Sequence, residues 1–172
     1  MSQPLMKQAE EQGPDDTLRR HLAWSGSPPT AARARAEADA LLSALQHTHQ
    51  VLIASRIADD IRLVVSELVT NATRHAPGPG RLELDTADRG RTVRITVRDT
   101  SPAMPLPQPA DPRRAGGHGL RIVEALSSRL TVQRTDEGKQ ITAELALHQR
   151  RTPPRPDRYY VDVDGARDGA PE

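Results

Sequence analysis

The chain has 172 residues, of which 35% are hydrophobic and 27% charged, and 24 Lys and Arg against 23 Asp and Glu leave a net charge of +1. A charge this close to neutral gives no overall electrostatic basis for binding nucleic acid or an anionic membrane surface. Cysteine is absent, which excludes disulfides, thiolate metal sites and a cysteine nucleophile. The sequence offers no apolar run near the roughly 18 residues that a membrane span needs and no signal-peptide pattern, so we expect a cytoplasmic protein.

The aromatic content is unusually low. Aromatic residues make up 2% of the chain and phenylalanine is absent, so the core must be built from Ala, Leu, Val and Ile. Composition divides the chain into three parts: a tail over 1–16, a folded domain over 17–148, and a C-terminal tail over 149–172 rich in Pro, Arg, Asp and Gly. Both tails lack hydrophobic periodicity, and we expect them to be disordered.

Two amphipathic helices are predicted first in the folded part, after a short stretch over 18–24 that could add a strand. The first helix follows Pro29 and Thr30, and one face of it carries Ala34, Ala38, Leu41, Leu42 and Leu45. The second begins with Ser55 as its expected N-cap and ends before Pro77. Its apolar stripe consists of Ile57, Ile61, Val64, Val65, Leu68 and Ala72.

Beyond this helix the apolar period changes from 3.6 to 2, which predicts a hairpin over 82–98 with a turn at 88–90. Residues 101–112 hold five of the 15 prolines and must form a loop. Glycines at 116, 117 and 119 lead into a short helix, and two further strands are expected over 131–134 and 140–147. This order predicts an α+β fold, a two-layer sandwich whose mixed, mostly antiparallel sheet is covered on one face by helices.

The second helix carries a polar face beside its apolar stripe. Glu67, Asn71 and His75 follow one another at intervals of four residues, so they lie along one side of the helix. A carboxylate there can accept a proton from a nucleophile, and a carboxamide oxygen one turn away can ligate Mg²⁺. The alternative for this motif alone is an ordinary solvated helix face.

Two further features follow in the chain. Asp99 ends an alternating strand, where a carboxylate can accept a hydrogen bond from an exocyclic amine such as that of adenine, or simply cap a turn. The glycine-rich segment 116–119 precedes a helix, an arrangement that suits phosphate but also suits a plain hinge. Neither feature is specific alone.

Together, the polar helix, the strand-end aspartate, the long loop and the glycine-rich helix start resemble the GHKL, or Bergerat, ATP-binding fold of histidine kinases, type II topoisomerases and heat-shock chaperones. More closely, SELVTNATRHA, VRDTSPAMP and GGHGLRIVEALSSRL resemble the single-domain anti-sigma factor serine/threonine kinases of actinomycete bacteria. The resemblance covers about residues 20–147.

The resemblance implies roles for the residues of the second helix. Glu67 would be the general base that activates a Ser or Thr hydroxyl, and Asn71 would be the Mg²⁺ ligand. Arg74 falls where relatives carry a basic residue able to reach phosphate, and His75 closes the motif.

For the nucleotide, the resemblance implies that Asp99 reads adenine and that residues 101–118 form a lid. The other residues expected at the ATP site are Ser101, Gly117, His118, Gly119 and Leu120. The second motif departs from the Asp-x-Gly-x-Gly of the wider family, because Ser101 and Ala103 replace both glycines.

The function implied is transfer of the ATP γ-phosphate to a small antagonist protein of the STAS type, with a sigma factor and a second copy of the chain as further candidate partners. The alternative is a nucleotide-binding partner switch that transfers no phosphate, and a protein that binds partners without nucleotide is a further possibility. A detached histidine-kinase catalytic domain is less favoured, because no dimerisation helix with a phosphoacceptor histidine is recognised before the domain.

Overall fold

A computed structural model describes residues 17–25, 27, 29–105, 118–148 and 159–162, the last four by their backbone alone. The described strands are β1 (Arg19–Trp24), β2 (Gly80–Ala87), β3 (Thr92–Asp99), β4 (Arg129–Thr135), β5 (Gly138–Ala146) and β6 (Tyr159–Asp162). The described helices are α1 (Ala31–Thr48), α2 (Ser55–His75) and α3 (His118–Leu126).

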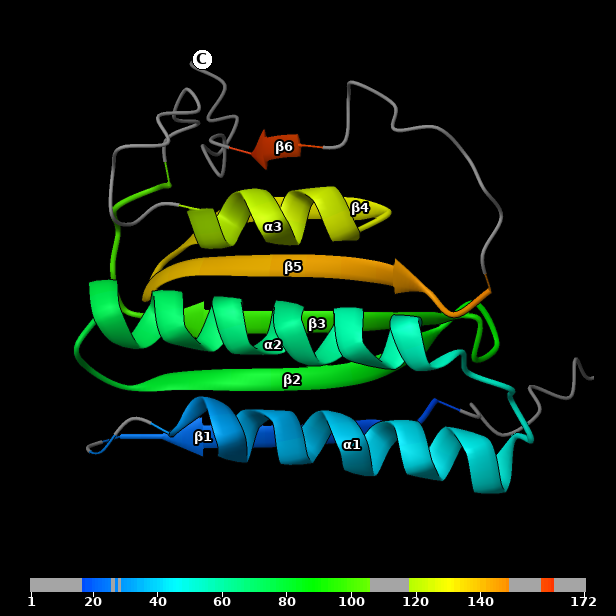
Figure 1. The fold of residues 1–172 in the computed structure, drawn as a ribbon. Coiled ribbons are helices and arrows are strands. Elements are labelled where there is room, and N and C mark those ends of the chain that lie inside the picture. The colour runs from blue at the N-terminus through cyan, green and yellow to red at the C-terminus, as the bar shows by residue number, and fades with distance from the viewer. Residues whose placement is uncertain (1–16, 26, 28, 106–117, 149–158, 163–172) are drawn as a thin grey trace, which may run out of the picture.

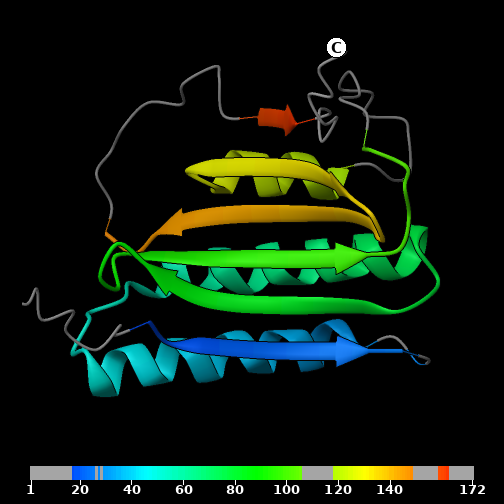
Figure 2. The ribbon, with the colours of Figure 1, turned by 180° about the vertical axis from the view of Figure 1, so that it is seen from behind.

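The six strands form one sheet in the order β1-β2-β3-β5-β4-β6. Neighbouring strands are antiparallel except for β4 and β6, which run parallel. All three helices lie on the same face of this sheet (Figure 1), and the view from behind shows the opposite face without a helix in the described part of the chain (Figure 2). The predicted two-layer α+β sandwich with a mostly antiparallel sheet is therefore confirmed.

One strand of the sheet falls within the segment expected to be a disordered tail. Residues Tyr159–Asp162 form β6, which pairs with β4 from Leu130 to Gln133. Strand pairing of this kind depends on a partner edge elsewhere in the chain, so local composition did not reveal it. The rest of the segment 149–172, like the segment 1–16, lies outside the described residues.

The two long helices bury the predicted stripes, although one of them begins differently from the prediction. Thr30 caps α1, its side chain accepting a hydrogen bond from the backbone N–H of Arg33 at 3.2 Å. Ser55 is the first residue of α2 and not its cap, because the N–H groups of Ile57 and Ala58 both donate to the carbonyl of Ala54. That bonding fixes Ala54 as the cap, without a side-chain hydrogen bond.

The core between helices and sheet is aliphatic, as the composition requires. Its largest fully buried side chains come from both layers and are Leu41, Leu45, Ile61, Leu68, Leu82, Leu84, Ile95, Leu130, Ile141 and Leu147. Trp24 is buried beside Gly80, its partner in the β1·β2 register, where any Cβ would overlap the indole. Across the residues that the structure describes, no helix has the length and apolar character needed to span a membrane.

Candidate nucleotide site

The residues singled out by sequence gather at one end of the molecule. Figure 1 shows the C-terminal end of α2, the end of β3 and the beginning of α3 at the same end of the sandwich, on the left of that view. The beginning of β5 lies there too, because β5 runs antiparallel to β3 and Lys139 pairs with Asp99.

The polar face of α2 is arranged as predicted. Leu68 and Ala72 are buried against the sheet, whereas Glu67 and Asn71 are half-buried beside them. No hydrogen bond or ion pair joins the side chain of Glu67 or Asn71 to another described residue, so the side-chain oxygens of both remain available to a ligand. Arg74 and His75 are exposed in the last turn, where a cation is also favoured by the helix dipole. Glu67, Asn71 and His75 thus follow one another along α2 as predicted, and Arg74 lies in the same last turn as His75.

The beginning of α3 lies directly against Glu67. A Cβ built on Gly119 would overlap the Oε2 atom of Glu67 and lie 3.3 Å from its Cδ. Gly119 therefore leaves the room that the Glu67 carboxylate occupies, which brings the helix and glycine motifs together. His118 is exposed at the first position of α3, and Leu120 packs against the core. Gly117 lies outside the described residues.

Replacing Gly119 by alanine should test this contact. The overlapping atom is the far end of a flexible side chain, so Gly119→Ala is expected to change the free energy of unfolding by less than about 1 kcal/mol while moving the Glu67 carboxylate. Under the general-base role that the resemblance implies for Glu67, phosphoryl transfer should fall by about tenfold or more, since a reacting group displaced by an ångström loses its alignment. Urea unfolding and a transfer assay measure the two effects, with Ala125→Gly on the exposed side of α3 as the control. A stable variant with full transfer would show that this contact is irrelevant.

Asp99 ends β3 as a buried carboxylate. Its Oδ1 atom accepts a hydrogen bond from the backbone N–H of Ser101 at 2.9 Å and a second from Nζ of Lys139 at 2.8 Å. The side chains of Asp99 and Lys139 are each 3% exposed, so the ion pair is almost fully removed from water. Ser101 thus contributes its backbone to the strand end, while its hydroxyl accepts from the N–H of Ala103 at 3.3 Å.

Lys139 was missed from the sequence, as were the two glycines that surround this strand end. Gly138 has a φ of +151°, and a Cβ there would overlap the carbonyl oxygen of Asp99. Gly78 lies against Thr100, with its hypothetical Cβ 2.9 Å from Oγ1. Close backbone approach near Asp99 is therefore supplied by glycines outside the second motif. The sequence did carry one indication of a buried lysine. Lys139 alternates in step with Ile141, Ala143 and Leu145, so its side chain is on the same buried face of β5.

Magnesium fits the donor set only together with a nucleotide. Among the described residues, no three His, Asp or Glu side chains form a cluster that could hold a metal. Asn71 brings a single neutral oxygen, and Mg²⁺ commonly combines one or two protein ligands with phosphate oxygens and water. The residues present therefore suit a metal that arrives with phosphate.

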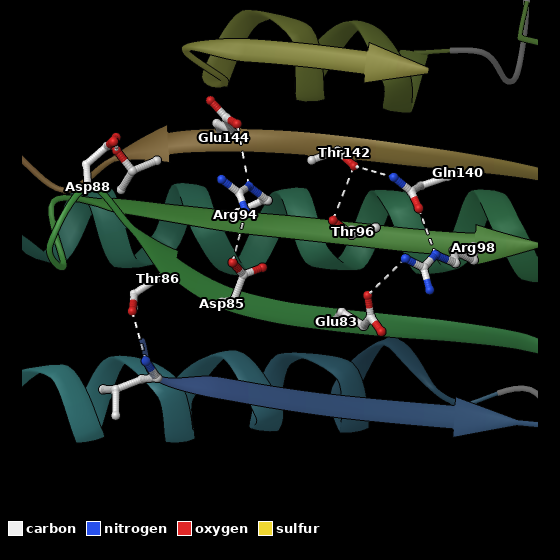
Figure 3. A network of polar contacts seen from close by, with 12 residues as sticks. Glu83, Asp85, Thr86, Asp88, Arg94, Thr96, Arg98, Gln140, Thr142 and Glu144 are labelled. Carbon is white, nitrogen blue, oxygen red and sulfur yellow. Dashed lines mark hydrogen bonds and ion pairs between the residues drawn. The ribbon is translucent and has the colours of Figure 1, made fainter. Parts of the chain in front are cut away.

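The face of the sheet without helices carries a separate polar network (Figure 3). Arg94 contacts Asp85 at 3.2 Å and Glu144 at 3.5 Å, and Arg98 contacts Glu83 at 3.6 Å and the side-chain carbonyl of Gln140 at 2.7 Å. Burial raises the pKa of the Asp85 carboxyl, an effect that Arg94 and Arg19 oppose. The arginines and carboxylates in this network pair with one another, as charged side chains commonly do on a sheet face that is exposed to solvent.

The α+β sandwich, with its described helices on one face of a mostly antiparallel sheet, is the fold of the GHKL class. Residues 28–145 match the family described as the histidine kinase-like ATPase domain. Because the match spans more than half of the chain, the protein belongs to the histidine kinase-like ATPase family, and it is accordingly an ATP-binding, kinase-like protein.

Among the solved structures similar to this chain, the first named here supports the fold. One is the crystal structure of the RsbU and RsbW domains of Rv1364c from Mycobacterium tuberculosis, with a TM-score of 0.53, 23% identity, and coverage of 84% of this chain and 34% of that chain. The chain thus spans about a third of that protein's length. Another is the histidine kinase domain of the blue-light activated histidine kinase from Erythrobacter litoralis EL346, with a TM-score of 0.41, 26% identity, and coverage of 66% and 61%. No curated protein matches the chain.

Proposed function

We propose that the protein is a serine/threonine kinase of the anti-sigma factor type, which transfers the γ-phosphate of ATP to a small antagonist protein. The observation that carries the proposal is the placement of Glu67 against Gly119, with Asn71 one turn further along α2 and Asp99 at the same end of the sandwich. Phosphoryl transfer needs groups that position its reactants. The parts expected here are a proton acceptor, a metal ligand, a helix start that faces phosphate and a carboxylate that binds adenine.

In this mechanism Glu67 would accept the proton of the attacking Ser or Thr hydroxyl as the hydroxyl oxygen forms a bond to the γ-phosphorus, while the bond from that phosphorus to the bridging oxygen breaks and ADP leaves. Bound ATP with Mg²⁺ supplies the phosphoryl group and neutralises part of its charge. Asn71 would hold the metal through its side-chain oxygen. Arg74, His75 and the residues at the start of α3 would orient the phosphates, and Asp99 would accept a hydrogen bond from the base.

Replacing Glu67 by glutamine tests the catalytic role. Glu67→Gln keeps the size of the side chain but cannot accept the proton, so transfer from labelled ATP to candidate antagonist proteins of the same genome should fall by about 100-fold or more. ATP affinity measured by calorimetry should stay within about threefold, because the substitution removes no group assigned to ground-state binding. Glu144→Gln, on the opposite sheet face, is the matched control. Undiminished transfer by Glu67→Gln would defeat the assignment.

A nucleotide-binding switch without phosphoryl transfer is the second candidate. It is favoured by two features after strand β3: Ser101 and Ala103 replace the motif glycines, and the Asp99 carboxylate already accepts a hydrogen bond from the Lys139 ammonium. Tight ATP binding with no transfer to any antagonist would support this function over the kinase. Under both proposals the partners are a small STAS-type antagonist and a sigma factor, and a homodimer is the proposed assembly.

A further inference from the structure

The face of the sheet without helices carries more positive charge than its own carboxylates neutralise. An open hollow of about 630 Å³ lies on this face, and its lining includes three carboxylates and six arginines, namely Arg19, Arg20, Arg81, Arg94, Arg98 and Arg129. We propose that this hollow docks an extended acidic segment of a partner protein. The face lies across the sheet from α2 and α3, so docking there does not depend on the proposed kinase reaction.

The three carboxylates of the hollow are each paired with arginine within the sheet. Arg94 lies between Asp85 and Glu144 and contacts both, at 3.2 and 3.5 Å (Figure 3). The third carboxylate, Glu83, lies 3.0 Å from Arg81 and contacts a second arginine at 3.6 Å. The hollow therefore has no further carboxylate among the described residues to neutralise the remaining arginines.

Two arginines of the hollow are left over. Arg20 pairs outside it, with Glu37 of α1 at 2.7 Å. Arg19 and Arg129 are exposed, and the side chain of neither forms an ion pair or hydrogen bond with another described residue. Their guanidinium groups can therefore bind carboxylates of a partner, with two parallel hydrogen bonds each.

The two remaining arginines lie at opposite ends of one row across the sheet. In the strand register, Arg19 lies opposite Asp85, and Arg94, Glu144 and Arg129 follow, so the charges alternate in sign along the row. Four strand spacings separate the two end positions, which is about 19 Å. An extended chain covers this distance in about six residues. A segment with acidic residues about six positions apart therefore reaches both arginines.

The alternation of charge favours a protein segment over a nucleic acid. Between the two end arginines the row carries the carboxylates of Asp85 and Glu144. A nucleic acid has a phosphate at every nucleotide and would bring negative charge over them, whereas a peptide can place acidic residues only where the arginines lie. In addition, no described residue that lines the hollow is Trp, Tyr or Phe, the side chains on which unpaired bases stack.

Fluorescence anisotropy with a labelled synthetic peptide and the full chain tests this docking surface. The peptide carries two acidic residues at each end and serine, threonine and lysine between them, so that its acidic ends lie about six residues apart. At low ionic strength it should bind at least about fivefold more tightly than a peptide of the same composition whose four acidic residues are adjacent. The reason is that only the spaced peptide reaches both arginines at once.

Charge reversal locates the binding site. Arg19→Glu combined with Arg129→Glu should weaken binding of the spaced peptide by about tenfold or more, since two attractions become repulsions. Arg33→Glu combined with Arg56→Glu changes the net charge equally, but at exposed positions of α1 and α2, so the affinity should stay within about twofold. Circular dichroism should show both variants folded, because all four positions are exposed.

Each of four results would overturn the proposal. Equal affinity for the two peptides, which is measured on the unmodified protein, would show that the spacing of the arginines is irrelevant. Equal weakening by the two variants would reduce the attraction to net charge. Tighter binding of a thymidine oligonucleotide than of the spaced peptide would assign the hollow to nucleic acid. A dimer that dissociates in sedimentation only when Arg19 and Arg129 are reversed would assign it to a second copy of the chain.

Discussion

Replacing Lys139 by methionine is expected to lower the free energy of unfolding by about 3 to 5 kcal/mol, because the substitution leaves the Asp99 carboxylate buried without its cation. Both side chains are 3% exposed, so water cannot compensate for the lost partner as it would at the surface. Removing a single member of a buried pair costs more than the pair contributes in total, since the remaining group keeps its full desolvation penalty.

Urea unfolding followed by circular dichroism measures this loss. The double variant Asp99→Asn with Lys139→Met should recover a large part of it, because no uncompensated charge remains. Arg62→Met is the surface control: Arg62 pairs with Asp39 at 2.6 Å, but its side chain is 37% exposed, and exposed pairs contribute about 0 to 1 kcal/mol. A cost for Lys139→Met no larger than that of the surface control would contradict the buried-pair description.

Replacing Gly138 by alanine should destabilise the protein by about 3 kcal/mol or more, since two costs combine at this position. The φ of +151° is unfavourable for a residue with a side chain. In addition, the new Cβ would lie 2.6 Å from the carbonyl carbon and 2.7 Å from Cα of Thr100, which are backbone atoms that cannot rotate away. The backbone after Asp99 would have to move, and nucleotide binding should weaken with it.

Gly90→Ala provides a matched comparison at another glycine with positive φ. Gly90 has a φ of +76° in the 88–90 turn, but the nearest atom to its hypothetical Cβ is Cδ2 of Leu45 at 3.8 Å. This variant should lose about 1 kcal/mol, from backbone conformation alone. Thermal or urea unfolding of the two variants side by side separates the conformational cost from the steric one, and equal losses would show that the close approach at Gly138 is unimportant.

The elements predicted correctly are those whose hydrophobic periodicity is contained in a short, continuous stretch of sequence. The stripe from Ile57 to Ala72 placed α2 with its buried face, and the polar residues Glu67 and Asn71 followed from the same periodicity. The cap of α2 was assigned one residue too late, because a serine at the start of a helix is a common cap and only the hydrogen bonds to Ala54 decide the boundary. The contact between Glu67 and Gly119 joins α2 to the start of α3, and it depends on the packing of the two helices.

Strand partners were harder to predict, since pairing joins segments that are distant in sequence. Strand β6 pairs with the edge strand β4, and a segment of four residues is too short for its hydrophobic pattern to predict a strand. Lys139 was not predicted as a buried residue because a single lysine at a strand end is usually exposed to solvent. Its buried position has a physical reason only when Asp99 is known to lie opposite it in the sheet.

By itself, the sequence determined the two amphipathic helices, the alternation of the strands, the aliphatic core and the polar face of α2, since each depends on a period of 3.6 or 2 along the chain. Only the tertiary structure decided that Lys139 lies opposite Asp99 and that Gly138 and Gly78 surround the same strand end. Sheet register couples residues 40 positions apart, and it is set by the packing of the whole layer and not by any local preference.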